Sequence, residues 1–237
     1  MVNFTHRVGW HWHEARRLVD AGAIGEVRYV RAKYVQAWLA ADYWGNWMEE
    51  KWLWRLQSAK GSTGVLGDIG CHIIDFVTGI VGPAERLRCS LHTHPKISPA
   101  GRRTTKVKGV ALDANDTASI ELDLLNGAFA SVQASRWATG RANEVQAEIS
   151  GTEGAILVGH GGPAYLQTCL GKDRHSNTWK EVKLRNSPSN YQRFITAIKK
   201  GVVEQPDITR GAEIQSYLDA CFRADAEQRA VKVKSWG

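Results

Sequence analysis

The stretch Gly64-Val65-Leu66-Gly67-Asp68-Ile69-Gly70-Cys71-His72-Ile73-Ile74-Asp75 begins a run of apolar residues at helical spacing that a Gly-Pro pair ends. We predict a helix over residues 65–81. On it, Asp68, His72 and Asp75 fall at i, i+4 and i+7, so they form one narrow polar line. Apolar residues occupy the other directions, so the helix should be buried nearly all round.

A buried imidazole or carboxylate needs a partner or a function. Because His72 lies one helical turn from Asp68, it could act as a general base whose orientation the carboxylate controls. The alternative is a satisfied buried pair that stabilises a helix end or a neighbouring loop. Spacing alone favours this structural interpretation and leaves catalysis open.

The sequence around this helix predicts a sheet. Alternating apolar and polar residues indicate a strand over 26–38, and further strands are expected at 85–94, 116–124, 127–137, 144–150, 155–158, 164–170 and 179–184. Asn126-Gly127 is typical of a tight hairpin turn. Strands that come in runs rather than alternating with helices indicate an α+β fold with an open, largely antiparallel sheet.

Helices on one face of this sheet should complete the fold. A short helix is expected at residues 14–21, and two more near the C-terminus. The apolar stripes of the two C-terminal helices should cover one side of the sheet. These stripes are formed by Tyr191, Phe194, Ile195 and Ile198 in the first helix and by Ile214, Tyr217, Leu218, Cys221 and Phe222 in the second. The uncovered face should then be apolar, with Val132 and Ala134 as candidates, and should form a homo-oligomer contact.

Composition narrows the class of protein. A content of 43% hydrophobic and 23% charged residues is ordinary for a globular chain. No segment approaches the ~20 apolar residues of a membrane span, and the N-terminus shows no export signal, so we expect a soluble, cytoplasmic protein. The four cysteines lie far apart without a CxxC pair, which argues for free thiols rather than a zinc knuckle or a disulfide scaffold.

Metal and nucleic-acid binding have weaker support. His11/His13 and His92/His94 stand at alternate positions, but no third ligand lies nearby in the sequence, so no metal site is predicted. The basic run at residues 101–109 is bracketed by glycines and is typical of a solvated loop. If nucleic acid did bind there, retention on DNA would depend strongly on salt.

The segment 64–75, preceded by Trp54-Arg55, resembles the signature of the Gfo/Idh/MocA family, named for glucose–fructose oxidoreductase, inositol dehydrogenase and a rhizopine-catabolism protein. Residues 21–27 are similar to the family's entry into its second domain, residues 150–154 to a turn of its sheet, and residues 228–233 to its C-terminal end. The resemblance covers essentially the whole chain in the expected order.

This resemblance implies an enzyme with a Rossmann domain that binds NAD or NADP, followed by a domain that supplies the substrate pocket and the oligomer contact. Asp68 and His72 would be the catalytic pair, with His72 moving the proton of a substrate hydroxyl. Trp54, Arg55 and Asp75 would contact the substrate, a sugar, polyol or related cyclic hydroxy compound. Arg can donate hydrogen bonds to hydroxyls, and Trp offers an apolar face to sugar C–H groups.

The family's nucleotide-binding motifs do not occur in the sequence. A dinucleotide fingerprint needs G-x-G-x-x-G after a strand, and neither residues 151–154 nor residues 159–162 have this spacing; the family's Glu-Lys-Pro motif is also absent. The resemblance makes residues 1–7 the remnant of the last strand of a missing dinucleotide-binding domain, and residues 8–237 the substrate-binding and oligomerisation domain. As given, the chain should neither bind NAD tightly nor turn over.

Three explanations of this arrangement stay open. The chain could be a fragment of a full enzyme, one half of a naturally split enzyme, or a non-catalytic module that binds a carbohydrate or another subunit. Met1 would stand at a strand edge without a turn or cap around it, which favours the fragment.

Overall fold

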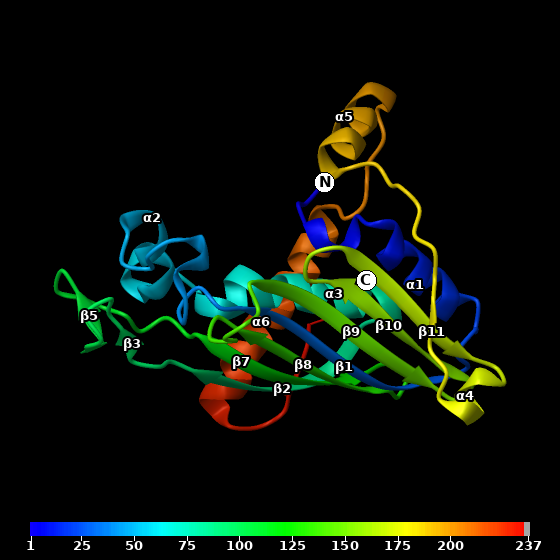
Figure 1. Ribbon diagram of the computed structural model, residues 1–237, viewed down its shortest axis with the longest axis horizontal. Coiled ribbons are helices and arrows are strands. Elements are labelled where there is room, and N and C mark those ends of the chain that lie inside the picture. The colour runs from blue at the N-terminus through cyan, green and yellow to red at the C-terminus, as the bar shows by residue number, and fades with distance from the viewer. Residues whose placement is uncertain (235–237) are drawn as a thin grey trace.

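A nine-stranded sheet forms the centre of the molecule in the computed structural model, which describes residues 1–234. Its strand order is β12-β11-β10-β9-β1-β8-β7-β2-β13. Strands β1 (Val27–Gln36) and β8 (Phe129–Ser135) pair in parallel, and the other neighbours in this sheet are antiparallel. Figure 1 shows this sheet open at both edges, which confirms the predicted α+β class with an open, largely antiparallel sheet.

Most strands lie where alternation predicted them. The remaining strands of the large sheet are β2 (Ala84–His92), β7 (Thr117–Leu124), β9 (Asn143–Gly151), β10 (Gly154–His160), β11 (Ala164–Leu170), β12 (Lys180–Glu181) and β13 (Val231–Lys232). Gly127 adopts a φ of 82° in the turn that joins β7 to β8, so the hairpin signal was correct. The strand expected over 179–184 is reduced to β12.

Three helices cover one face of the sheet. Helix α1 (Trp10–Asp20) packs on β10 and β11, α3 (Cys71–Val81) on β1 and β8, and α6 (Ile208–Glu227) on β2. The strand residues that point toward these helices form the main core together with the apolar faces of the helices. The predicted placement of helices on one face is therefore confirmed.

Val132 and Ala134 do not lie on the open face, contrary to the prediction. Both are fully buried in the main core, because the strand period turns even-numbered residues of β8 toward the helices. The opposite face is polar rather than apolar. It carries the ion pairs Arg31–Glu148 and Arg88–Glu121 and, beside them, the exposed rings of Tyr29 and Phe129.

Helix α5 (Asn190–Lys200) also differs from the prediction. It was expected to cover the sheet with its apolar stripe, but it projects from the body of the molecule beside the N-terminus (Figure 1). Its apolar side chains are exposed to solvent. The apolar stripe was identified correctly. Such a stripe shows that one face of a helix favours burial, but it does not show which surface buries that face.

Residues 39–60, a Trp-rich connection for which no helix or strand is predicted, form a lobe at one end of the sheet (Figure 1). It consists of short helical turns: η2 (Asp42–Trp44), α2 (Glu50–Leu53), η3 (Trp54–Leu56) and η4 (Ser58–Lys60). A second small core, which includes Trp38, Trp47 and Leu56, holds the lobe together. Beside it lie two short hairpins, β3 (Lys96–Ile97) with β4 (Arg103–Thr104) and β5 (Lys106–Val107) with β6 (Val110–Ala111).

Residues 1–7 contain a 3-10 turn, η1 (Thr5–Arg7), and no strand. The backbone N–H of Val2 donates a hydrogen bond to the carbonyl of Pro206 at 2.6 Å, which ties this segment to the C-terminal helices. Its assignment to another domain stays a prediction. The remaining short helix, α4 (Asp173–Ser176), follows β11. Among residues 1–234, no helix is long and apolar enough to cross a membrane.

Candidate active site

The predicted helix over residues 65–81 exists, but its first part is a π-helical turn, η5 (Leu66–Gly70), which leads into α3. A Cβ on Gly67 would lie 1.7 Å from the hydroxyl oxygen of Thr63, so a larger residue here would force the Thr63 side chain to move. A π turn widens the helix, so the α-helical spacing used for Asp68 and His72 does not describe their actual relation.

Asp68 binds two arginines instead of the histidine. Its Oδ2 accepts a hydrogen bond from Nη2 of Arg136 at 2.9 Å, and its Oδ1 lies 3.8 Å from Nε of Arg55. Throughout residues 1–234, Asp68 has no hydrogen bond to His72. In this structure the carboxylate is thus held by arginines, and a catalytic role for Asp68 and His72 stays a prediction.

Arg136 connects this site with the Trp-rich lobe. Its side chain is fully buried, donates from Nη1 to the carbonyl of Arg55 at 3.2 Å, and lies against the ring of Trp38 at 5.1 Å. Burial lowers the pKa of Arg136 from its ordinary value, while the charge of Asp68 acts in the opposite direction. The buried Arg136 thus holds both the carboxylate of Asp68 and the backbone that carries Arg55.

His72 is largely buried, and its Nδ1 atom has no hydrogen-bond partner within the described part of the chain. Its ring makes edge contacts with Phe4, His6 and Tyr34, at centroid distances of 5.7, 5.1 and 6.3 Å. Burial lowers the pKa of His72 below its usual value, although Asp75 and Asp68 act to raise it. The imidazole is therefore neutral near pH 7 and able to accept a proton.

A cavity of about 230 Å³ brings four of the five predicted site residues together: Trp54, Arg55, Asp68 and His72. Arg136, Gly67, Cys71 and the segment 61–64 complete its lining. The guanidinium of Arg55 lies 4.6 Å from the ring centre of Trp54, whose side chain is 46% exposed. An exposed aromatic face beside hydrogen-bonding side chains suits a polyhydroxy ligand.

Asp75 does not line this cavity. Its side chain is 1% exposed and accepts hydrogen bonds from Arg7 at 2.9 Å and from Arg210 at 2.7 Å. These two arginines enclose its carboxylate, and the contact of Asp75 with substrate stays a prediction. A larger cavity of about 640 Å³ at this end of α3 is lined by the same arginines, which pair with Asp75 and, in the case of Arg210, also with Glu213.

The histidines beside His72 were not predicted as part of the site. Nδ1 of His6 lies 2.8 Å from Nε2 of His160, and burial lowers the pKa of His6 to about 3. His11 also lies near His160, with ring centres 6.1 Å apart. His11 and His13 belong to α1 rather than to a strand, so alternate positions do not place them on one side. Across residues 1–234, no three His, Cys, Asp or Glu side chains are arranged to hold a metal ion.

Comparison with known proteins identifies the family. A model described as the GFO/IDH/MocA C-terminal domain matches residues 12–157, well over half of the chain. The chain belongs to the GFO/IDH/MocA family. Among its curated relatives, a levoglucosan dehydrogenase of Pseudarthrobacter phenanthrenivorans is 29% identical over 187 residues, covering 73% of this chain and 46% of the relative. An inositol 2-dehydrogenase of Rhizobium meliloti is 23% identical over 240 residues, covering 98% and 64%.

Solved structures of GFO/IDH/MocA proteins share the fold. A levoglucosan dehydrogenase in complex with NADH and L-sorbose superposes with a TM-score of 0.84 at 26% identity, covering 100% of this chain and 66% of that one. An oxidoreductase domain protein from Kribbella flavida gives a TM-score of 0.80 at 25% identity, covering 99% and 66%. This chain therefore spans about half to two thirds of the length of these relatives.

The residues described here do not form a cradle for the pyrophosphate of NAD. Such a cradle needs a strand, a Gly-rich turn and the N-terminus of a helix in direct succession. Within residues 1–234, the helices that cover the sheet follow loops, and the glycines at 159–162 connect β10 to β11 instead. The chemistry assigned to these residues is therefore limited to the substrate and its proton.

Proposed function

We propose that this chain supplies the substrate site of an NAD(P)-dependent oxidoreductase that acts on a sugar, polyol or related cyclic hydroxy compound. The observation that carries the proposal is the shared cavity of His72, Asp68, Arg55 and Trp54, together with the buried Nδ1 of His72, which has no hydrogen-bond partner within residues 1–234. An unsatisfied buried polar atom costs about 1–3 kcal/mol, and such atoms are tolerated at functional sites. The named activities of the levoglucosan and inositol dehydrogenase relatives support this substrate class.

Each side chain of the cavity has a distinct task in this proposal. One C–H face of the sugar ring packs on the exposed face of Trp54, and Arg55 donates hydrogen bonds to the hydroxyls. Asp68 accepts a hydrogen bond from a substrate hydroxyl while Arg136 holds its carboxylate in place. His72, which is neutral near pH 7, accepts the proton of the hydroxyl that is oxidised.

We further propose that residues 8–237 act as a substrate-binding and oligomerisation domain, and that residues 1–7 lead in from a dinucleotide-binding domain. Without that domain, the chain would bind neither NAD nor NADP tightly and would be inactive. A homo-oligomer would form through the open face of the sheet, where Tyr29 and Phe129 are exposed between ion pairs. The four free cysteines are consistent with the reducing environment of the cytoplasm.

A non-catalytic module that binds a carbohydrate or another subunit is the alternative. The engagement of Asp68 by two arginines favours this alternative, because a carboxylate held in this way does not assist the histidine. The two functions differ in what His72 does. In a binding module His72 only shapes the cavity, whereas in an oxidoreductase it also exchanges a proton.

Titration calorimetry with levoglucosan, myo-inositol and L-sorbose tests the proposal on the chain as it stands. We expect at least one ligand to bind, and we expect Trp54→Ala and His72→Asn each to weaken binding by about tenfold, the effect of ~1.4 kcal/mol. His175→Asn is the matched control, because His175 is exposed and lies outside the cavity. Equal affinities for wild type and both cavity variants would contradict a sugar site at His72.

The reduction of NAD by the sugar separates the two functions. If His72 takes the hydroxyl proton, addition of a dinucleotide-binding domain and NAD should give turnover that His72→Asn abolishes, even at saturating sugar. If the chain is a binding module, the wild-type mixture should bind sugar and reduce no NAD.

A further inference from the structure

A second cavity adjoins the cavity around His72 and lies in the Trp-rich lobe. We call it the lobe cavity; its volume is about 310 Å³, and Trp54 lines both cavities. The chain itself passes from one to the other, since Lys60 lines the lobe cavity and Gly61 lines the His72 cavity. Small-molecule sites usually measure ~300–1,000 Å³. The His72 cavity, at about 230 Å³, is small for such a site, whereas the two cavities together have an ordinary size.

Gln57 brings a buried carboxamide to the lobe cavity. The residue is only 3% exposed, and it is part of the cavity lining. Its backbone bonds to Trp54 and Lys60, but within residues 1–234 its side-chain amide forms no hydrogen bond. Buried polar side chains are normally hydrogen-bonded. An amide that is buried, lines a cavity and lacks a protein partner therefore points to a ligand that supplies the missing hydrogen bonds.

The backbone on both sides of Gln57 is held in place. The carbonyl of Leu56 accepts a hydrogen bond from the N–H of Ala114 at 3.1 Å. The N–H and the hydroxyl of Ser58 donate to the carboxylate of Asp113 at 2.8 and 2.6 Å. Gln57 thus keeps its position without any bond from its own side chain, and a ligand would not have to order this segment in order to bind.

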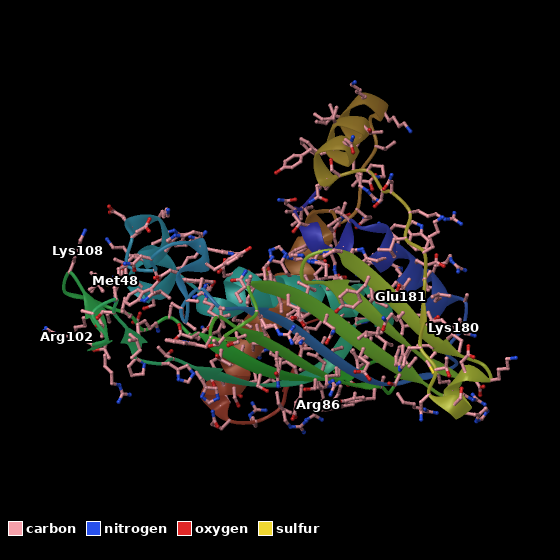
Figure 2. The ribbon with its side chains drawn as sticks, in the orientation of Figure 1. Met48, Arg86, Arg102, Lys108, Lys180 and Glu181 are labelled. Atoms are coloured by element: carbon pink, nitrogen blue, oxygen red, sulfur yellow. The ribbon has the colours of Figure 1, made fainter. Side chains whose placement is uncertain are left out.

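The β5–β6 hairpin forms another wall of the lobe cavity. Its turn places Lys108 at a φ of 49°, as a tight two-residue hairpin turn requires, and Figure 2 shows Lys108 at this tip beside the Trp-rich lobe. Val107 and Val110 flank the turn and line the cavity together with Leu53. The lobe cavity therefore combines aliphatic walls with the indole of Trp54 and one carboxamide.

This combination suits a neutral sugar ring. Aromatic and aliphatic surfaces pack on C–H groups, and a carboxamide both donates and accepts hydrogen bonds, as neighbouring hydroxyls do. The charged residues of the lining are Glu50, Lys60 and Lys108. All three are exposed and they include both signs, so they do not make a site for an anion.

We propose that the lobe cavity binds the second ring of a disaccharide or related glycoside whose first ring occupies the His72 cavity. This inference rests on the proposed function and narrows its substrate class. Both rings contact Trp54, which lines both cavities, and the second ring bonds to the amide of Gln57. A sugar with a single ring fills the His72 cavity and gains nothing from Gln57.

Titration calorimetry on the chain as it stands tests the proposal. The two-ring probes are cellobiose, maltose and lactose, with D-glucose as the single-ring reference and glucose 6-phosphate as the anionic reference. The cavity variant is Gln57→Met, which keeps the volume of the side chain but removes its hydrogen bonds. The control is Gln215→Met, because Gln215 is an exposed glutamine on α6 outside both cavities.

We expect at least one disaccharide to bind the wild type about tenfold more tightly than D-glucose does. Gln57→Met should lose most of this advantage and keep its affinity for D-glucose, and Gln215→Met should bind like the wild type. Three results overturn the proposal: no disaccharide binds more tightly than D-glucose, Gln57→Met weakens both sugars equally, or glucose 6-phosphate binds most tightly. The wild-type affinities decide the first and third results without any variant, so a folding defect of Gln57→Met does not leave the question open.

The same titrations separate this proposal from the proposed function. If single-ring sugars bind and lose affinity in His72→Asn, the sugar site at His72 stands even where disaccharides gain nothing, and only the lobe cavity fails. If no sugar of either size binds, both the His72 site and the lobe cavity are contradicted.

Discussion

Replacement of Asp75 by Asn tests the structural role that the fold assigns to this carboxylate. The substitution keeps the shape of the side chain but removes the charge that Arg7 and Arg210 share, at 2.9 and 2.7 Å. The side chains of Arg7 and Arg210 are only 10% and 13% exposed, so water solvates their charges poorly. Arg210 keeps a second partner in Glu213. Breaking a buried ion pair from one side costs about 3–5 kcal/mol, and we expect a loss of unfolding free energy in this range.

Urea unfolding followed by tryptophan fluorescence measures this loss. Asp123→Asn is the matched control, because Asp123 is a partly exposed carboxylate 3.9 Å from Arg88, and its removal should change stability by less than about 1 kcal/mol. Addition of Arg7→Met to Asp75→Asn should restore part of the stability, since it removes the guanidinium charge that loses its carboxylate partner. A loss below about 1 kcal/mol for Asp75→Asn, together with weaker sugar binding, would refute the structural role and return Asp75 to the substrate site.

Three further predictions follow from other parts of the molecule. Arg136→Met should weaken sugar binding by about tenfold in calorimetry, since Asp68 loses its buried partner; unchanged affinity would exclude this positioning role. Burial lowers the pKa of His6 to about 3 in the folded chain. Below pH 6.5 the unfolded chain therefore binds a proton at His6 that the folded chain does not, and the free energy of unfolding should fall by up to about 1.4 kcal/mol per pH unit as the pH falls toward 3. His6→Asn should flatten this decline in urea unfolding at several pH values, and an identical pH profile would contradict it. Val132→Glu should prevent stable folding, as judged by circular dichroism, whereas Gln133→Glu should be tolerated, because these neighbours face opposite sides of β8.

The sheet was predictable because its signals are local. Alternation along β7 and β8 and the Asn126-Gly127 turn depend on neighbouring residues, and all of them were located correctly. The side of the sheet to which Val132 points depends on which face the helices cover, and this is a property of the whole fold. The apolar stripe of α5 shows the same limitation, because the sequence reveals an amphipathic helix but not its orientation.

The candidate site was predictable in part because the segment 64–75 and Trp54-Arg55 resemble the family signature. Trp54, Arg55, Asp68 and His72 were identified from sequence, and the structure places them around one cavity, although their roles remain predictions. Arg136 lies 68 residues beyond Asp68, on another element, and no local pattern connects the two. The π-helical turn at Leu66–Gly70 is likewise invisible to an argument that assumes 3.6 residues per turn.

The most direct test of a sugar site at His72 is nuclear magnetic resonance of the histidine ring nitrogens during titration with levoglucosan. We expect the ring signals of His72 to shift in a saturable manner, because a substrate hydroxyl would bind at this imidazole. The signals of the exposed His175 should stay unchanged. Saturable binding of the sugar that leaves the His72 signals unchanged would contradict the account and place the ligand elsewhere in the molecule.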